Sequence, residues 1–191
     1  MEANYWQYYL SFEEDIDRLF RYIEPSEHNF PVYSVELTRL YLAICSEIDV
    51  LLKAYCKLLD ASSNPSRIDE YAKVVLSSNK GLCSETVKFQ RFGLLITPFS
   101  NWEPACAPVW WKKHNGVKHD RSVNFNDANL GNVLNSLAAF YLLNLYYYNE
   151  RNSVGLNDLG FSESLEKTAV SLESRLDVLR LDSVFLDIFQ N

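Results

Sequence analysis

Glycine and proline are scarce in this chain of 191 residues, with six of each. The many turns of a β-sandwich or β-barrel need these residue types, so their scarcity argues against an all-β fold. Basic residues do not predominate either, since the formal net charge is -7. An extended nucleic-acid-binding surface is therefore disfavoured, because long-range repulsion opposes a polyanion. A local basic pocket remains compatible with this charge.

The sequence also has little that points to a metal, a membrane or an oxidising compartment. Its four cysteines are widely spaced and include no Cys-x-x-Cys pair, so we predict neither a metal site nor a cofactor. No uncharged apolar run reaches the roughly 18 residues of a membrane span. The opening Met-Glu-Ala-Asn has neither the basic nor the apolar region of a secretory signal. We therefore expect a cytoplasmic protein with reduced thiols and no membrane partner.

Apolar residues recur at three- and four-residue steps in several segments, which predicts amphipathic helices. These segments are 4–24, 34–59, 67–77, a stretch that begins near Pro108, 126–148 and 162–179. Alternating residues near 83–103 indicate a small β-hairpin or an ordered loop. The fold class we predict is all-α, a bundle of about four to six helices that forms a single domain over residues 1–191.

Three boundaries are suggested by individual residues. Ser34 is placed to cap the helix over 34–59, because its hydroxyl can accept from a free amide of the first turn. Asn126 or Asp127 is the expected cap of the last long helix. The turn-prone pair Asn115-Gly116 is expected to end or kink the helix that begins near Pro108.

Side chains suited to proton chemistry gather between residues 110 and 121. Two of the three histidines, His114 and His119, lie there, and histidine alone titrates unperturbed near neutral pH. On a continuous helix Asn115 shares a face with His119, and His114 shares one with Lys118. A nearby cation would lower a histidine pKa and could bind a phosphate oxygen. The alternative is structural, with the polar run forming a helix cap and surface ion pairs and the tryptophans anchoring the core.

A family resemblance centres on residues 114–119, which read His-Asn-Gly-Val-Lys-His and precede a long helix rich in leucine and small residues. This segment resembles the signature of the HEPN superfamily, in which an arginine, a polar residue (often asparagine), three further residues and a histidine follow one another. Asn115 and His119 match the polar residue and the histidine. The upstream segment with Glu47 and Asp49 resembles the acidic helix that often precedes the signature. The resemblance implies a compact helical bundle of a type common in bacterial toxin-antitoxin and phage-defence systems.

Active HEPN proteins use the histidine and the arginine on the scissile phosphate of RNA, without a metal and with a ribose 2′-hydroxyl as nucleophile. The resemblance therefore implies that His119 is the acid-base group and that Asn115 orients it or contacts the phosphate. The arginine position holds His114, so His114, Lys118 or Arg121 would have to replace the guanidinium, and His114 joins His119 and Asn115 as a candidate catalytic residue. Neither histidine nor lysine reproduces the planar fork of arginine. The candidate phosphate-binding residues are the basic side chains around the signature: Lys113, Lys118 and Arg121.

Glu47 lies at the edge of the apolar stripe of the helix over 34–59, so we expect it to be partly buried. A buried carboxylate needs a cationic or hydrogen-bonding partner, and the basic residues of the signature are candidates. Glu47 would then orient the signature.

Three functions are compatible with these residues. One is a metal-independent endoribonuclease of a defence or toxin system, and another is a catalytically inactive HEPN-like bundle that binds RNA or a protein partner such as an antitoxin. The third is a helical interaction protein whose histidines only cap and pack. Family members commonly dimerise with their signatures facing each other, so the resemblance also implies a homodimer.

Overall fold

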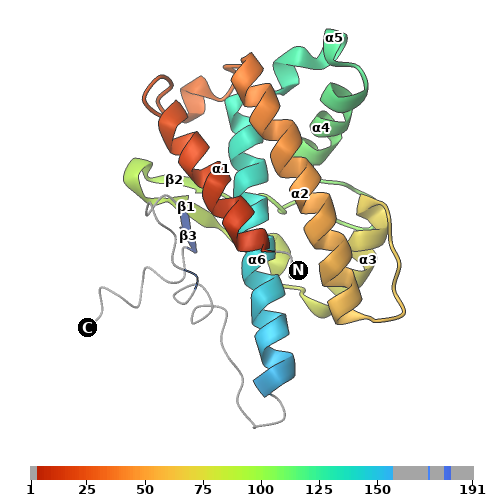
Figure 1. The fold of residues 1–191 in the computed structure, drawn as a ribbon. Helices are drawn as coiled ribbons and strands as arrows, with labels where there is room; N and C mark the ends of the chain where they lie inside the picture. Colours follow the sequence, from red (N-terminus) through yellow and green to blue (C-terminus); the bar gives the residue numbers. More distant parts are fainter. Residues whose placement is uncertain (1–3, 157–171, 173–178, 182–191) are drawn as a thin grey trace, which may run out of the picture.

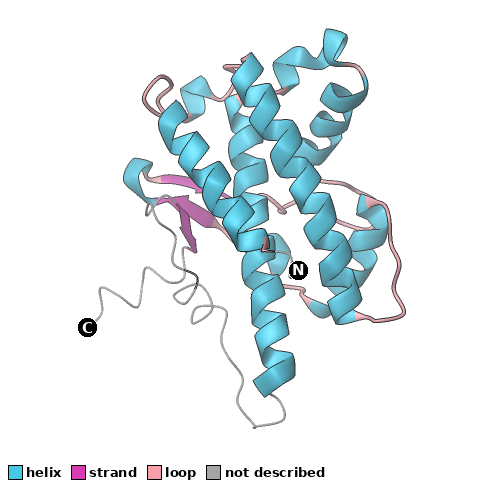
Figure 2. Cartoon of the chain, in the orientation of Figure 1, coloured by secondary structure: helices cyan, strands magenta, loops and turns pink. Residues whose placement is uncertain are grey.

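The structure, a computed structural model, describes residues 4–156, 172 and 179–181. Its helices are α1 (Tyr5–Leu19), α2 (Val35–Leu59), α3 (Ile68–Ser78), α4 (Val109–His119), α5 (Arg121–Asn124) and α6 (Leu130–Leu156). Three short strands, β1 (Val87–Phe89), β2 (Leu94–Ile96) and β3 (Leu179–Leu181), form one small sheet at the side of the helices (Figures 1 and 2). The predicted all-α bundle with a small hairpin is confirmed. Within the described residues, no helix combines the length and apolar character needed to cross a bilayer.

Helix α6 is the central element of the bundle. Every residue from Ser136 to Leu145 is buried, so its apolar surface runs all the way round the helix rather than along one stripe. Helices α1, α2 and α4 and strand β2 surround it, and α2 makes the most extensive contact. Its buried polar groups bond within the helix, as when Asn144 Nδ2 donates to the Phe140 carbonyl oxygen at 2.8 Å. The core therefore follows the axis of α6.

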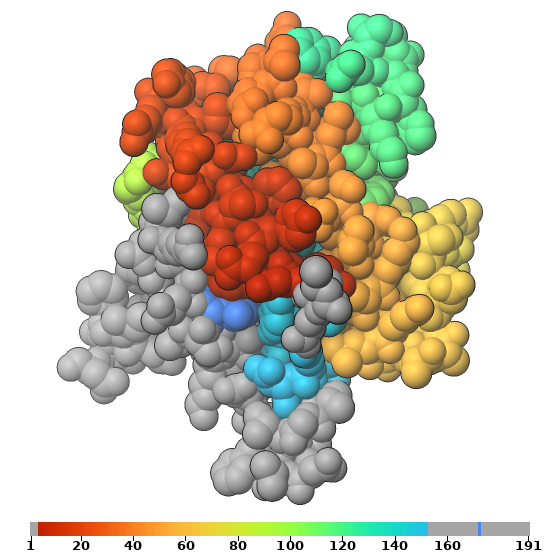
Figure 3. Space-filling model, viewed as in Figure 1, coloured from red at the N-terminus to blue at the C-terminus, as the bar shows by residue number. Residues whose placement is uncertain are grey.

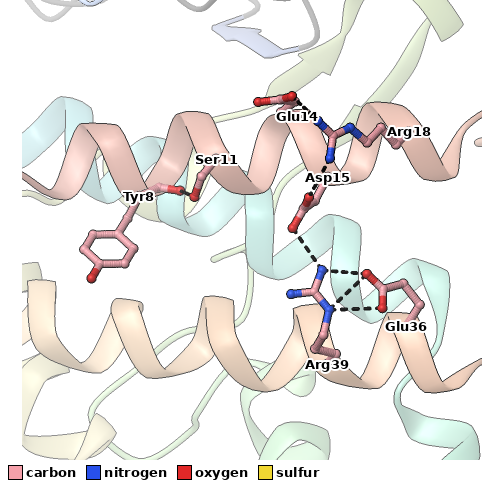
Figure 4. Close-up of polar contacts among 7 residues, drawn as sticks. All are labelled: Tyr8, Ser11, Glu14, Asp15, Arg18, Glu36 and Arg39. Atoms are coloured by element: carbon pink, nitrogen blue, oxygen red, sulfur yellow. Dashed lines mark hydrogen bonds and ion pairs between the residues drawn. The ribbon is translucent and has the colours of Figure 1, made fainter.

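Helices α1 and α2 begin at side-chain caps. The Ser34 hydroxyl accepts from the Leu37 amide at 3.1 Å, as predicted, and Asn4 accepts from the Gln7 amide at 3.2 Å. Arg39 of α2 then links the two helices, because its guanidinium bonds to Glu36 on its own helix and lies 2.9 Å from Asp15 Oδ2 on α1 (Figure 4). This bridge is solvent-exposed, so it fixes the pairing of α1 and α2 more than it stabilises the fold.

The hairpin of β1 and β2 is antiparallel, with Lys88 opposite Leu95. Gly93 supplies the left-handed conformation that the connection needs, with φ of 64°. Strand β3 pairs with the other edge of β1 and was not predicted. The expected helix over 162–179 lies almost wholly outside the described residues, and its last residue, Leu179, belongs to β3.

Trp110 fixes α4 to the rest of the bundle. Its indole Nε1 donates to the Pro98 carbonyl oxygen at 2.8 Å, which ties α4 to the loop after β2. Its own carbonyl oxygen accepts from the hydroxyl of Tyr41 on α2. Trp110 and Trp111 are both buried, so the tryptophans are core anchors.

Two predicted boundaries were wrong. Helix α4 continues through Gly116 to His119, and it ends where the side-chain amide of Asn124 donates to the Gly116 and Asp120 carbonyl oxygens. Helix α6 begins at Leu130 rather than after residue 126 or 127. The cap is Asn129, whose Oδ1 accepts from the Asn132 amide at 3.0 Å.

Candidate functional site

Helices α2 and α4 face each other with stripes that mix polar and apolar residues. Residues at spacings of three and four lie on one helix face, and both stripes have this spacing. From α2 come Leu42, Cys45, Ser46 and Asp49, and from α4 come Trp111, His114, Asn115 and Lys118. These two stripes line a cavity of about 650 Å³. We call it the α2–α3–α4 cavity.

The start of α3 forms the third wall, through Ser66, Arg67, Ile68 and Asp69. Glu70 caps this helix, because its Oε2 accepts from the Ser66 amide at 2.8 Å and from the Arg67 amide at 3.2 Å. The Arg67 guanidinium lies 3.1 Å from Asp69 Oδ2 and 3.3 Å from Glu70 Oε1. In the space-filling view, α3 and the α4–α5 segment flank α2 on the same side (Figure 3).

His114 is a buried wall of this cavity, with 5% of its surface exposed. Burial, and next the charge of Lys118, lower its pKa to about 4, so the imidazole is neutral at pH 7. Its ring lies 5.4 Å from that of Trp111, and its Nδ1 has no hydrogen-bond partner within the described chain. A buried polar atom left unpaired costs roughly 1–3 kcal/mol. The atom is enclosed by protein, so the cost is borne by the packed side of His114 and not by its cavity side.

Lys118 and His119 are adjacent in sequence but differ in position. Lys118 lines the cavity, and no ion pair of this lysine occurs among the described residues. His119 is exposed at the last position of α4 and does not line the cavity. Successive helical residues point about 100° apart. Because Lys118 faces the cavity, His119 points away from it. The cavity thus gathers His114, Asn115 and Lys118 and leaves out the histidine assigned to acid-base chemistry.

Glu47 makes no hydrogen bond or ion pair with the signature among the described residues and does not line the cavity. It lies off the cavity stripe of α2, where burial raises its pKa and Tyr5 of α1 is its electrostatic neighbour. Asp49 is the α2 carboxylate that reaches the cavity. Its Oδ1 accepts from the Tyr71 hydroxyl at 2.8 Å, and its Oδ2 pairs with Lys53. Glu47 and Asp49 are two positions apart, so their carboxylates lie on different faces of α2.

The remaining predicted phosphate-binding residues lie outside the cavity. Lys113 Nζ pairs with Asp127 at 3.1 Å. Arg121 lines a second hollow of about 520 Å³, which shares Leu42 with the cavity. Arg121 is therefore close to the cavity along α2 but is not part of its wall.

The described residues contain four free cysteines and no group of three or more histidine, cysteine or acidic side chains that could hold a metal ion. Cys45 and Cys56 are fully buried, and burial raises the pKa of both thiols. They are protonated core residues at neutral pH.

Arg67 is the functional candidate that sequence analysis missed. It precedes α3 after a loop, so no helical periodicity connects it to the signature more than forty residues later. A signal did exist for the α2 wall, because Ser46 and Asp49 are polar residues three apart within a strongly apolar helix. Their shared face could have been inferred, but what it faces depends on packing.

Comparisons of this chain with protein-family models, with curated proteins and with solved structures find no match.

Proposed function

We propose that this protein is a HEPN-like helical bundle that binds single-stranded RNA at the α2–α3–α4 cavity and does not cleave it. The observation that carries the proposal is the set of side chains that line the cavity, which includes the cations Arg67 and Lys118 beside Asp49 and Asp69 and excludes His119. Cationic side chains contact phosphate oxygens strongly. Single-stranded RNA is also recognised by polar groups that bond to the edges of its bases, and Ser46 and Asn115 provide exposed groups of this kind at the cavity.

Binding is favoured over catalysis because the two histidines do not form an acid-base pair in the cavity. A histidine that transfers protons at neutral pH needs a pKa near that pH. His114, with a pKa of about 4, is neutral and a weak base. His119 has the exposure of a surface residue and lies outside the cavity wall.

The acidic charge of the whole molecule does not contradict this proposal. A net charge of -7 repels RNA at long range and weakens non-specific binding. Near the cavity, Lys118 and Arg121 lie at the junction of α4 and α5, with Asp120 between them. Screening shortens the reach of the distant charges to about 8 Å at physiological salt. Binding then depends on the charges at the cavity, where Arg67 and Lys118 lie with Asp49 and Asp69.

The test is the affinity for a short single-stranded RNA, measured by fluorescence anisotropy for the wild type and for Lys118→Ala. We expect binding that is weakened about tenfold or more in the variant, because a charge-assisted contact of roughly 1.5–3 kcal/mol is lost. The matched control is Lys112→Ala, which removes a lysine of the same helix outside the cavity. Failure of the wild type to bind RNA, or equal weakening by the two substitutions, would contradict the proposal.

The nuclease hypothesis is tested in parallel with cellular RNA in the presence of EDTA. We expect no cleavage by either the wild type or His119→Ala. Cleavage by the wild type that disappears in the variant would overturn the non-catalytic proposal and restore His119 as a catalytic residue. A protein partner such as an antitoxin stays a prediction of the family resemblance.

A further inference from the structure

The second hollow lies beside the α2–α3–α4 cavity. Its volume is about 520 Å³, and Leu42 of α2 lines both spaces. A strand that leaves the cavity past Leu42 therefore enters the hollow. We infer that the bound RNA continues into the second hollow, where Arg121 contacts a phosphodiester and the apolar wall holds the neighbouring base. The inference rests on the proposed RNA binding and names a second position on the same strand.

The charges in the wall of the second hollow are positive. Arg39 and Arg121 line it, and no carboxylate does so among the described residues. Arg39 is already bonded to acidic side chains of α1 and α2, whereas Arg121 has no ion pair in the described part of the chain. Asp120 precedes it, but its Oδ1 accepts from the Ser122 hydroxyl at 2.6 Å. One unpaired guanidinium matches the single negative charge of a phosphodiester, and its planar fork can donate to two oxygens.

The rest of this wall is apolar and accessible, through Val35, Leu42 and Phe125. Val35 is 77% exposed, and the half-exposed Tyr33 packs edge-on against Phe125 and extends the apolar surface. Bases of a single strand rest on apolar and aromatic side chains of this kind beside a cationic groove. Val123 is also exposed but does not line the hollow, so a base held there leaves it uncovered.

The free cations of the two spaces are held at a fixed spacing by the junction of α4 and α5. Lys118 lines the cavity near the end of α4, and Arg121 begins α5 and lines the hollow. The Asn124 side-chain amide donates to the carbonyl oxygens of Gly116 and Asp120, at 3.3 and 2.8 Å, and so ties α5 to the last turn of α4. Successive phosphates of one strand can therefore meet Lys118 and then Arg121.

The experiment measures the affinity of the protein for a 3′-labelled oligouridylate by fluorescence anisotropy at several salt concentrations. A phosphate contact on a single strand contributes about 0.7 to the slope of log K against log salt concentration. We expect Arg121→Ala to reduce this slope by about 0.7 and to weaken binding about threefold to tenfold. Arg121→Lys should retain the slope, because it retains the charge, and should bind less tightly than the wild type because it lacks the planar fork.

The matched control is Arg21→Ala, which removes an exposed arginine that follows α1 and lines neither space. It should change neither the slope nor the affinity. The base position is tested with Val35→Ser, which reduces the apolar area of the hollow. We expect it to weaken binding about threefold at an unchanged salt slope, because it removes apolar contact and no charge.

The outcomes separate this inference from the proposed function. RNA binding that depends on Lys118 but is unaffected by Arg121→Ala would overturn the second position and leave binding at the cavity intact. Equal changes of slope in Arg121→Ala and Arg21→Ala would also overturn it, because the effect would then be one of net charge. An affinity that Val35→Ser leaves unchanged would remove the base from the hollow. Absence of any RNA binding by the wild type would overturn the inference together with the proposed function.

Discussion

His114 was selected from the sequence for its acid-base chemistry, but its burial determines its protonation state. Sequence spacing placed it at the arginine position of a signature, and the structure encloses it between Tyr41 and Trp111. Burial is the larger cause of its lowered pKa, and Lys118 adds to it. The same surroundings that remove its acid-base capacity at neutral pH make it a neutral hydrogen-bonding group in a cavity wall.

This lowered pKa predicts a specific loss of stability in acid. The His114 pKa falls from 6.5 to about 4 on folding, so the unfolded chain binds the proton first as the pH drops. The free energy of unfolding therefore has its full value above pH 6.5 and decreases as the pH falls toward 4. We expect wild type to lose about 2 kcal/mol more than His114→Gln between pH 7.5 and pH 5. Urea unfolding at both pH values measures this difference, and equal losses would contradict the assigned pKa.

At the scale of elements, the position of the cavity depends on how the connection before α2 meets the start of α6. The Gly131 amide donates to the Phe30 carbonyl oxygen at 3.1 Å, and the Leu130 amide donates to that of Val32 at 2.8 Å. Tyr33 and Asn129 form an isolated antiparallel bridge. These backbone contacts hold α2 and α6 in register, and α4 packs on both helices.

The close approach at Gly131 predicts that an added methyl group is destabilising. A Cβ there would lie 3.0 Å from Cβ and Cγ of Phe30, whose backbone is held by the bond to Gly131. We expect Gly131→Ala to lower the free energy of unfolding by about 1–3 kcal/mol, as overpacking does.

Gly81→Ala is the matched control for this substitution. A Cβ at Gly81 would lie 3.8 Å from the Tyr146 hydroxyl oxygen, and the backbone φ of -73° suits alanine. It should be neutral or stabilising by up to about 1 kcal/mol. Thermal and urea denaturation of both variants compare the two positions, and equal effects would show that Phe30 moves aside without cost.

At the scale of the whole molecule, exposed apolar side chains gather where the start of α2 meets α5. Val35 is 77% exposed and Val123 is 73% exposed. Tyr33 packs edge-on against Phe125, with 5.4 Å between ring centroids, and so joins the two segments. Exposed apolar residues that cluster are typical of interaction surfaces. This surface borders the second hollow through Val35 and Phe125.

The homodimer implied by the family resemblance stays a prediction, and this surface gives it a test. We expect sedimentation equilibrium to report a dimer for the wild type and a monomer for Val123→Glu, because a buried unpaired carboxylate opposes association. The control is Leu95→Glu, because Leu95 is 53% exposed and its strand, β2, lies on the opposite side of the helices from α5 in Figure 1. A wild-type protein of monomeric mass, or a dimer unaffected by Val123→Glu, would contradict this arrangement.

The helical class and the limits of α2 and α3 were determined by the sequence itself. Apolar spacing sets which segments form helices, and local caps such as Ser34 set where they begin, because both depend on residues within a few positions. The limits of the last long helix were harder to predict. Asn126, Asp127 and Asn129 are all suitable caps in sequence, and the backbone contacts of residues 129–131 to residues 30–33 select Asn129.

The signature segment was likewise found from its residue types, but its membership in a site was decided by tertiary packing. Residues 114, 115, 118 and 119 all lie on one helix, and only the rotation of α4 against α2 selects the first three. Arg67 and Asp49 joined them from other elements, and the same packing left Glu47 outside. Sequence periodicity defines the faces of each helix. Which faces meet depends on how side chains distant in sequence pack together, and this packing forms only when the chain folds.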